Sequence, residues 1–296
     1  MKKQTRIYML SALAALVSTS LASPDVWAQT VEFSDNFENY TITPPATDLR
    51  LPASATKPSY NFWARDGDSN RDSRVTLDEG NLFGAGDNQY LRIFSTADAT
   101  ADNNLLTTSF ASVTQGKLSF DFLVAPGAIS SNRNFLVMLL SDTSVGDFSA
   151  NTPSQAVTGF FISDGLVHQK TAGKSSRGEN NFAFTTGQKH TLSIVFNNAD
   201  GTLTYEGGSV SSGYADFWLD GSKIATWVLG QGDNLSNGAG VDGLSLRIQK
   251  GSDYAEILLD NLELTSIPEP SALVLTGGAL LVAILSKKGI AKSLQR

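Results

Sequence analysis

Cysteine is absent from the 296-residue chain, and histidine occurs only twice, at His168 and His190. Without cysteine the protein has no disulfide framework, no thiol nucleophile and no thiolate ligand for a metal. A chain of this length buries enough apolar surface to fold without disulfide bonds, so the absence does not argue against export. Two histidines and no Gly-x-Ser-x-Gly sequence leave little from which to build a catalytic triad or a zinc site.

The first 28 residues have the organisation of a secretory signal peptide. A basic start precedes residues 7–21, which are mostly apolar, carry no charge and are expected to form the signal helix. Val26-Trp27-Ala28 supplies small residues at the two positions that a signal peptidase reads, which predicts cleavage after Ala28. The alternative is an N-terminal membrane anchor, but the apolar run is short for that and Pro24-Asp25 interrupts it.

The last thirty residues hold the most specific motif of the sequence. Pro268, Glu269 and Pro270 precede an uncharged apolar stretch, 271–285, and a basic end that includes Lys287 and Lys288. In order, spacing and terminal position, residues 267–296 resemble the PEP-CTERM sorting domain. The basic cluster is Lys-Lys where the family is usually Arg-rich, and the tail continues for eight residues after Lys288. The resemblance implies recognition by an exosortase-type membrane enzyme, removal of the tail, and release or transfer to the cell surface.

The predicted tail helix is short for a membrane span. Residues 271–285 would extend about 22 Å, against a hydrocarbon core of ~30 Å. The lysines can snorkel, and the basic end should stay cytoplasmic. We therefore expect transient anchoring in the inner membrane before processing, with the body then at the cell surface or in the extracellular matrix. The alternative is a permanent C-terminal anchor.

The body between the two ends, residues 29–266, is acidic. Seven of the 22 basic and two of the 29 acidic residues lie outside it, which leaves 15 basic and 27 acidic residues and a formal charge near −12. A charge of this sign disfavours nucleic-acid binding. It favours solubility, cation binding and repulsion from anionic lipid.

The body alternates apolar and other side chains with a period of two, as β-strands do. The clearest examples are residues 118–124, 191–196 and 244–249. Further strands are predicted at 31–38, 89–95, 133–141, 156–163, 214–219, 222–228 and 254–265. The dipeptides Asp220-Gly221, Asp200-Gly201 and Asn237-Gly238 predict turns, the first of them a two-residue hairpin.

More than ten short strands and no helical period predict an all-β domain with two antiparallel sheets packed as a sandwich. Residues 257–264 resemble the last strand of concanavalin A-like or laminin-G-like jelly rolls, which implies that topology. The apolar side chains shift from the odd positions Ile257 and Leu259 to the even positions Leu262 and Leu264, which predicts a bulge near Asp260-Asn261. Residues 43–59 hold four of the nine prolines and predict an extended covering loop.

One segment has the spacing of a calcium loop. Asp68, Asn70, Asp72, Arg74 and Glu79 fall at the positions that supply side-chain oxygens, a backbone carbonyl and a final bidentate carboxylate. The segment resembles an EF-hand or dockerin loop, but Ser73 stands where glycine allows the sharp turn, and no helix pattern follows. The alternative is an Asp-rich loop that enters a strand at 74–77. Asp66 and Asp78 are alternative ligands.

Aromatic side chains near the Asp220-Gly221 turn suggest a surface for sugar stacking. Trp218 and Trp227 flank this turn, and Tyr214 lies on the same predicted hairpin. The alternative is that the tryptophans pack in the core, as most sandwich tryptophans do.

Carboxylates on the last strand do not have the spacing of a glycosidase pair. Glu256 and Asp260 would lie about 13 Å apart along one strand. A retaining pair needs about 5 Å and an inverting pair up to about 9.5 Å. Together with Glu263 they are interpreted as surface carboxylates.

These patterns favour a non-catalytic, lectin-like sandwich that is not an enzyme and contacts exopolysaccharide. Its partners would be signal peptidase, an exosortase-type enzyme and, transiently, the inner membrane, with calcium as a possible cofactor and no nucleic acid. One alternative is a secreted carbohydrate-active hydrolase or lyase, which would need two carboxylates within about 10 Å in a cleft. Another is a purely structural matrix protein.

Overall fold

The computed structural model describes residues 29–43, 46–50, 60–62, 70–84, 86, 88–130, 134–141, 152–174, 176–232, 235 and 238–268. These residues form eighteen strands and one short 3₁₀ segment, η1 (Thr152–Gln155). The predicted signal peptide and nearly all of the predicted sorting tail lie outside the described residues, and so do their expected helices. Within the described ranges, no helix is long and apolar enough to cross a membrane.

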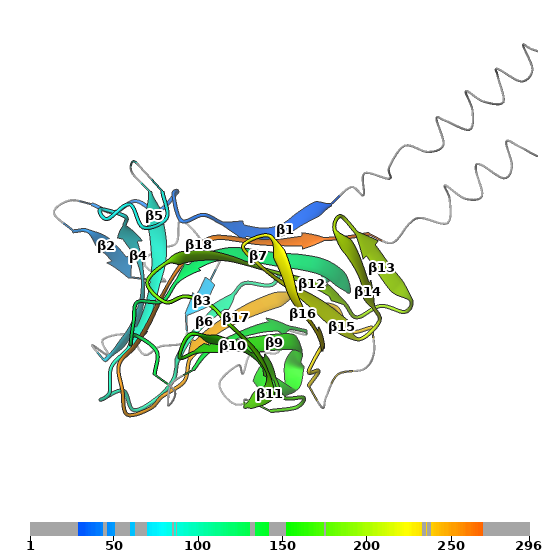
Figure 1. Cartoon of the computed structure of the whole chain (residues 1–296). Helices are drawn as coiled ribbons and strands as arrows, with labels where there is room; N and C mark the ends of the chain where they lie inside the picture. The colour runs from blue at the N-terminus through cyan, green and yellow to red at the C-terminus, as the bar shows by residue number, and fades with distance from the viewer. Residues whose placement is uncertain are drawn as a thin grey trace, which may run out of the picture. The chain divides into compact units, whose positions relative to one another are not determined.

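The larger sheet has nine strands, in the spatial order β16-β15-β12-β7-β18-β5-β4-β2, with β1 paired to β18 (Figure 1). All its pairs are antiparallel. The strands are β1 (Thr30–Asp35), β2 (Asp48–Arg50), β4 (Arg71–Leu77), β5 (Gln89–Ser95), β7 (Gln115–Leu123), β12 (Lys189–Asn197), β15 (Tyr214–Leu219), β16 (Ser222–Val228) and β18 (Ala255–Ser266).

The second sheet has seven antiparallel strands, in the order β11-β10-β9-β8-β17-β6-β3. They are β3 (Tyr60–Phe62), β6 (Asn103–Thr107), β8 (Phe135–Leu140), β9 (Ala156–Ser163), β10 (Leu166–Lys170), β11 (Arg177–Ala183) and β17 (Gly243–Ile248). A separate hairpin joins β13 (Thr202–Tyr205) to β14 (Gly208–Ser211).

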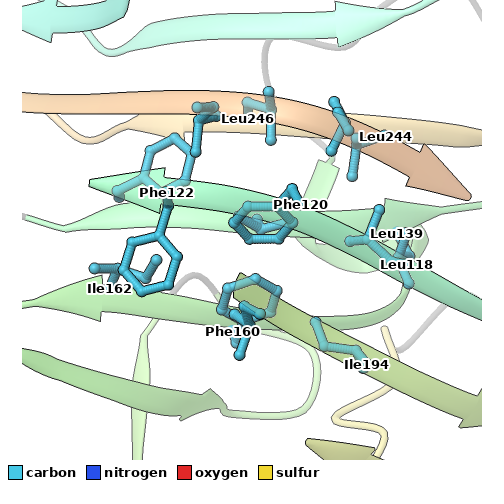
Figure 2. Close-up of a cluster of buried hydrophobic side chains, with 14 of the residues drawn as sticks. Leu118, Phe120, Phe122, Leu139, Phe160, Ile162, Ile194, Leu244 and Leu246 are labelled. Carbon is cyan, nitrogen blue, oxygen red and sulfur yellow. The ribbon is translucent and has the colours of Figure 1, made fainter. Parts of the chain in front are cut away.

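The core lies between the two sheets. Figure 2 shows Leu118, Phe120 and Phe122 of the larger sheet directed toward Phe160 and Ile162 of the other. The rings of Phe120 and Phe160 stack with centroids 6.2 Å apart. Each such side chain contributes about 1.5–3 kcal/mol when it leaves water, so this shared apolar layer holds the sheets together.

The two layers and their antiparallel pairing confirm the prediction of an all-β fold and are consistent with a jelly-roll sandwich. Strands β5, β9, β15 and β16 cover the predicted ranges. The Asp220-Gly221 hairpin is also confirmed, with positive φ angles of 50° and 77° at its two turn residues. The sequence prediction missed several short strands, among them the β13–β14 hairpin.

Candidate active site

Two aspartates lie opposite each other on the outer face of the larger sheet. In the antiparallel pair of β7 and β18, Asp121 is the register partner of Asp260. Their neighbours Phe120 and Leu259 belong to the core, so the alternation of the strands directs both carboxylates away from it. Residues that are directly opposite in this way have Cβ atoms about 4.5–5.5 Å apart.

The predicted bulge brings a third side chain into the pair. The register shifts between Asp260 and Glu263, and Asn261 has a left-handed φ of 53°. Asn261 donates its backbone N–H to Asp260 Oδ1 at 2.7 Å and its Nδ2 to Asp121 Oδ2 at 3.0 Å. A regular strand would direct the side chain at 261 to the opposite face, so the bulge is what allows this contact.

Donors from β12 surround Asp121. Thr191 Oγ1 donates to Asp121 Oδ1 at 2.5 Å, and Lys189 Nζ lies 3.6 Å from Asp121 Oδ2. With Asn261, the carboxylate therefore has two hydrogen-bond donors and a cation beside it. Such an arrangement stabilises negative charge on Asp121.

Asp260 has the opposite environment. It is 1% exposed, and this burial raises the pKa of Asp260 to about 6, against an ordinary value of 3.8. The hydrogen bonds from the Asn261 N–H and from Asn88 Nδ2, at 3.3 Å, lower the pKa of Asp260. The charges of Asp121 and Glu38 raise it further. Near neutral pH Asp260 can therefore take up and release a proton.

A polar cavity of about 320 Å³ lies where the end of β1 meets the bulge in β18. It adjoins the aspartate pair through Asn261. It is lined by Ser34, Asp35, Asn36, Asn39, Asn261, Leu262 and Glu263. Amides, a hydroxyl and carboxylates of this kind bind ligands that present several hydroxyl groups.

The structure corrects the predicted geometry of the calcium segment. Residues 71–77 form strand β4, and Asp72, which is buried, pairs with Arg50 at 2.7 Å and with Arg74 at 3.0 Å. Asn70 accepts a hydrogen bond from Thr96, and Glu79 is exposed. No three acidic or histidine side chains among the described residues are placed to hold a metal. Asp68 and Asp66 lie outside those residues, so calcium binding stays a prediction.

The three aromatic residues of the predicted sugar surface are not brought together. Trp227 is buried in the core with its ring 4.4 Å from that of Phe217. Trp218 lies on the outer face of the sheet, where it packs against Tyr205 and donates Nε1–H to its hydroxyl at 3.2 Å. Tyr214 is exposed. Because the two tryptophans lie on opposite faces of the sheet, they cannot form one stacking surface.

Of the three carboxylates on the last strand, Asp260 was misjudged as a surface group. Glu256 pairs with Arg92 at 2.9 Å and Glu263 is exposed, as surface carboxylates are. The partner of Asp260 comes from another strand, and sequence reasoning did not find it. The available signal was that Asp121 is the one charged residue in the alternating apolar segment 118–124.

No protein-family model matches the chain, and no curated protein matches it. Several solved structures are similar to it. The catalytic domain of an endo-1,3-beta-glucanase (laminarinase) from Thermotoga petrophila RKU-1 has a TM-score of 0.49 and 12% identity, over 82% of this chain and 100% of that one. A carbohydrate esterase, vb_24B_21 from Shiga toxin-encoding bacteriophage phi24B, has a TM-score of 0.47 and 16% identity, over 80% and 100%. Alginate lyase Aly36B has a TM-score of 0.46 and 11% identity, over 79% and 96%.

This comparison corrects the expectation of a non-catalytic, lectin-like domain that is not an enzyme. All three of these similar structures are named for an activity on carbohydrates. We therefore withdraw that expectation. Because these TM-scores lie below 0.5, the activity of this chain has to be inferred from its own side chains.

Proposed function

We propose that the protein is a secreted glycoside hydrolase in which Asp121 and Asp260 act as the catalytic carboxylates. The observation that carries this proposal is the contrast between the two groups. Asp121 has two hydrogen-bond donors and the Lys189 ammonium beside it, and Asp260 is buried with a pKa of about 6. Two neighbouring carboxyl groups in such different surroundings are typical of acid–base catalysis.

In this mechanism Asp260 is the general acid. It donates its proton to the glycosidic oxygen as the bond to the anomeric carbon breaks, and the leaving sugar departs as an alcohol. Asp121 is the nucleophile that attacks the anomeric carbon. Water then releases the second product, with Asp260 taking the proton back from that water. Because the two residues are directly opposed, their carboxyl groups can approach the separation of about 5 Å that retaining glycosidases use.

The sugar chain would cross the outer face of the larger sheet, with one unit in the cavity beside Asn261. Asn36 and Asn39 offer amide groups to its hydroxyls there. Because Asp260 is covered in part by Asn88, substrate binding has to move that side chain aside.

We also propose that the chain is exported, and that its C-terminal segment sorts it through the inner membrane to the cell surface or matrix. The support for this is the order of Pro268-Glu269-Pro270, apolar stretch and basic end in the sequence. A polysaccharide at the cell surface would then be the natural substrate of the hydrolase.

The products of the reaction test the proposed activity. The full chain in mild detergent is incubated with a panel of neutral and anionic polysaccharides. We expect new reducing ends without unsaturated products, and net retention at the anomeric carbon. Unsaturated products would indicate a lyase and overturn the hydrolase. If no polysaccharide gives a product, the proposed activity is contradicted and the aspartate pair has only a structural role.

A further inference from the structure

His190 lies between the two β12 residues that hold Asp121, and each of its ring nitrogens faces an oxygen. Nδ1 is 2.7 Å from Asp220 Oδ2, and Nε2 is 2.8 Å from the carbonyl oxygen of Thr185. A carbonyl oxygen can only accept, so Nε2 has to carry a hydrogen. The carboxylate of Asp220 is also an acceptor, so Nδ1 has to carry one as well. The doubly protonated, positively charged ring satisfies both contacts at once.

Asp220 is suited to pair with that charge. Burial of the carboxyl raises its pKa, but the hydrogen bonds from His190 and from the Thr191 N–H outweigh this, so the pKa of Asp220 is lowered overall. The other groups packed on the ring are Phe122 and Phe184, with centroids 5.6 and 5.8 Å away, and neither ionises. Lys189 and Thr191, the chain neighbours of His190, direct their side chains to the opposite face.

The same carboxylate also fixes Thr191. Asp220 Oδ1 accepts the Thr191 N–H at 2.9 Å, and the Asp220 N–H donates to the Thr191 carbonyl at 2.9 Å. Asp220 thereby holds two consecutive residues of β12 from the turn between β15 and β16. Thr191 in turn donates its hydroxyl to Asp121.

We propose that protonated His190 and Asp220 form a clamp that positions Thr191 and Lys189 against Asp121, and that loss of the His190 proton loosens it. This inference rests on the proposed function in so far as Asp121 is the nucleophile. When His190 is neutral, one ring nitrogen becomes an acceptor that faces another acceptor, so the contact to Asp220 or to Thr185 is lost. His190 is then a positioning residue, because it acts on the reaction only through its chain neighbours Thr191 and Lys189.

The chain offers a matched control for each substitution. His168 is the only other histidine, and it lies on β10 of the second sheet. Asp164-Gly165 forms a turn between β9 and β10 with φ angles of 53° and 72°, close to those of Asp220-Gly221. His168→Gln and Asp164→Asn therefore make the same chemical changes, in similar backbone settings, away from Asp121.

The test combines hydrogen exchange with kinetics on the full chain in mild detergent. In the wild type, the amides of Thr191 and Asp220 should be protected at pH 5 and lose about tenfold or more of that protection by pH 9, after correction for intrinsic exchange. In His190→Gln and Asp220→Asn the protection should be low at every pH, and kcat should fall about tenfold with KM changed less than twofold. The two control variants should match the wild type.

Three outcomes are distinct. Protection and kcat that are unchanged in His190→Gln would overturn the clamp. Protection lost in His190→Gln but independent of pH in the wild type would overturn the role of the proton. A wild type that shows the pH-dependent protection but cleaves no polysaccharide would support the clamp and contradict the proposed function.

Discussion

Asp260 makes the folded protein sensitive to pH, because the folded state holds its proton more tightly than the unfolded chain does. The pKa of Asp260 is about 6 in the fold and 3.8 in the reference state. Its stabilising contribution is therefore fully present below about pH 3.8 and is lost as the pH rises through about 6. At neutral pH the protein keeps a buried charge that costs stability, as catalytic groups often do.

The substitution Asp260→Asn should remove this cost. Relative to the wild type, we expect the unfolding free energy of the variant to gain about 2–3 kcal/mol as the pH rises from 4 to 7. Urea unfolding at several pH values measures this gain. Asp200→Asn, in an exposed turn, is the control and should show no such trend. A gain that does not depend on pH would contradict the raised pKa.

The two tryptophans near the hairpin should differ in their effect on stability. Trp227 is buried against Phe217 and Phe182, so Trp227→Ala should cost about 3–5 kcal/mol through the cavity that it leaves. Trp218 is only partly buried under the β13–β14 hairpin, and Trp218→Ala should cost less. Urea unfolding followed by circular dichroism compares them. Equal costs would contradict their placement on opposite faces.

At the residue scale, the sequence indicates which residue types could serve in a catalytic site, but not which of them lie together in the fold. Alternation predicts that Asp121 points away from the core side of its strand. The pairing of Asp121 with Asp260, 139 positions later in the chain, depends on β7 and β18 being neighbours. The whole topology of a sandwich decides which strands are neighbours, and a local sequence pattern does not predict that topology.

Among the elements, β18 decides the geometry of the site through its bulge. Asn261 occupies the left-handed region, where a β-branched side chain is strained by about 1–2 kcal/mol and glycine is not. We therefore expect Asn261→Val to be about 1–2 kcal/mol less stable than Asn261→Gly. Both variants lose the hydrogen bond to Asp121, so both should lose activity by a similar factor.

Urea unfolding and steady-state kinetics on the two variants separate these effects. Equal stability of the two would show that the bulge does not require the left-handed backbone. Full activity in Asn261→Gly would show that the side chain of Asn261 is not needed at Asp121.

Prediction from sequence worked best for elements with a strong local signal. Period-2 alternation located β5, β9, β15 and β16, and Asp-Gly marked their hairpin. The phase change in 257–264 located the bulge. The hairpin β13–β14 was missed because its strands have only four residues each, too few for alternation to stand out. The start of strand β4 was read as part of a loop because Asp72 matched a ligand position, whereas in the fold Asp72 pairs with Arg74 of the same strand and with Arg50 of β2.

At the scale of the whole molecule, the proposal of sorting concerns the two ends of the chain. The protein isolated from its producing cells should have lost both the signal peptide and the segment after Pro270. Intact mass spectrometry of the wild type and of a variant with Ala at positions 268–270 measures this. The variant should retain its tail and stay in the membrane fraction. A wild-type protein that keeps its tail would contradict the proposed sorting and would indicate that the tail is a permanent membrane anchor.

The acidic body bears on the substrate at the same scale. A formal charge near −12 over residues 29–266 repels anionic polymers at a distance. Neutral polysaccharides should therefore be cleaved faster than anionic ones of similar length at low ionic strength. Added salt should narrow the difference, because it screens the repulsion.

The most direct test of the catalytic pair is the rate of reducing-end release by Asp260→Asn, compared with the wild type and Asp200→Asn. The polysaccharide is the one that the wild type cleaves best, and the rates are followed from pH 4 to pH 8. The wild-type rate should fall as the pH rises through about 6, where Asp260 loses its proton. Asp260→Asn should be at least about 100-fold slower at pH 5, since it cannot supply a proton, while Asp200→Asn keeps the wild-type rate and profile. An Asp260→Asn variant that cleaves as fast as the wild type would contradict the assignment of Asp260 as the general acid.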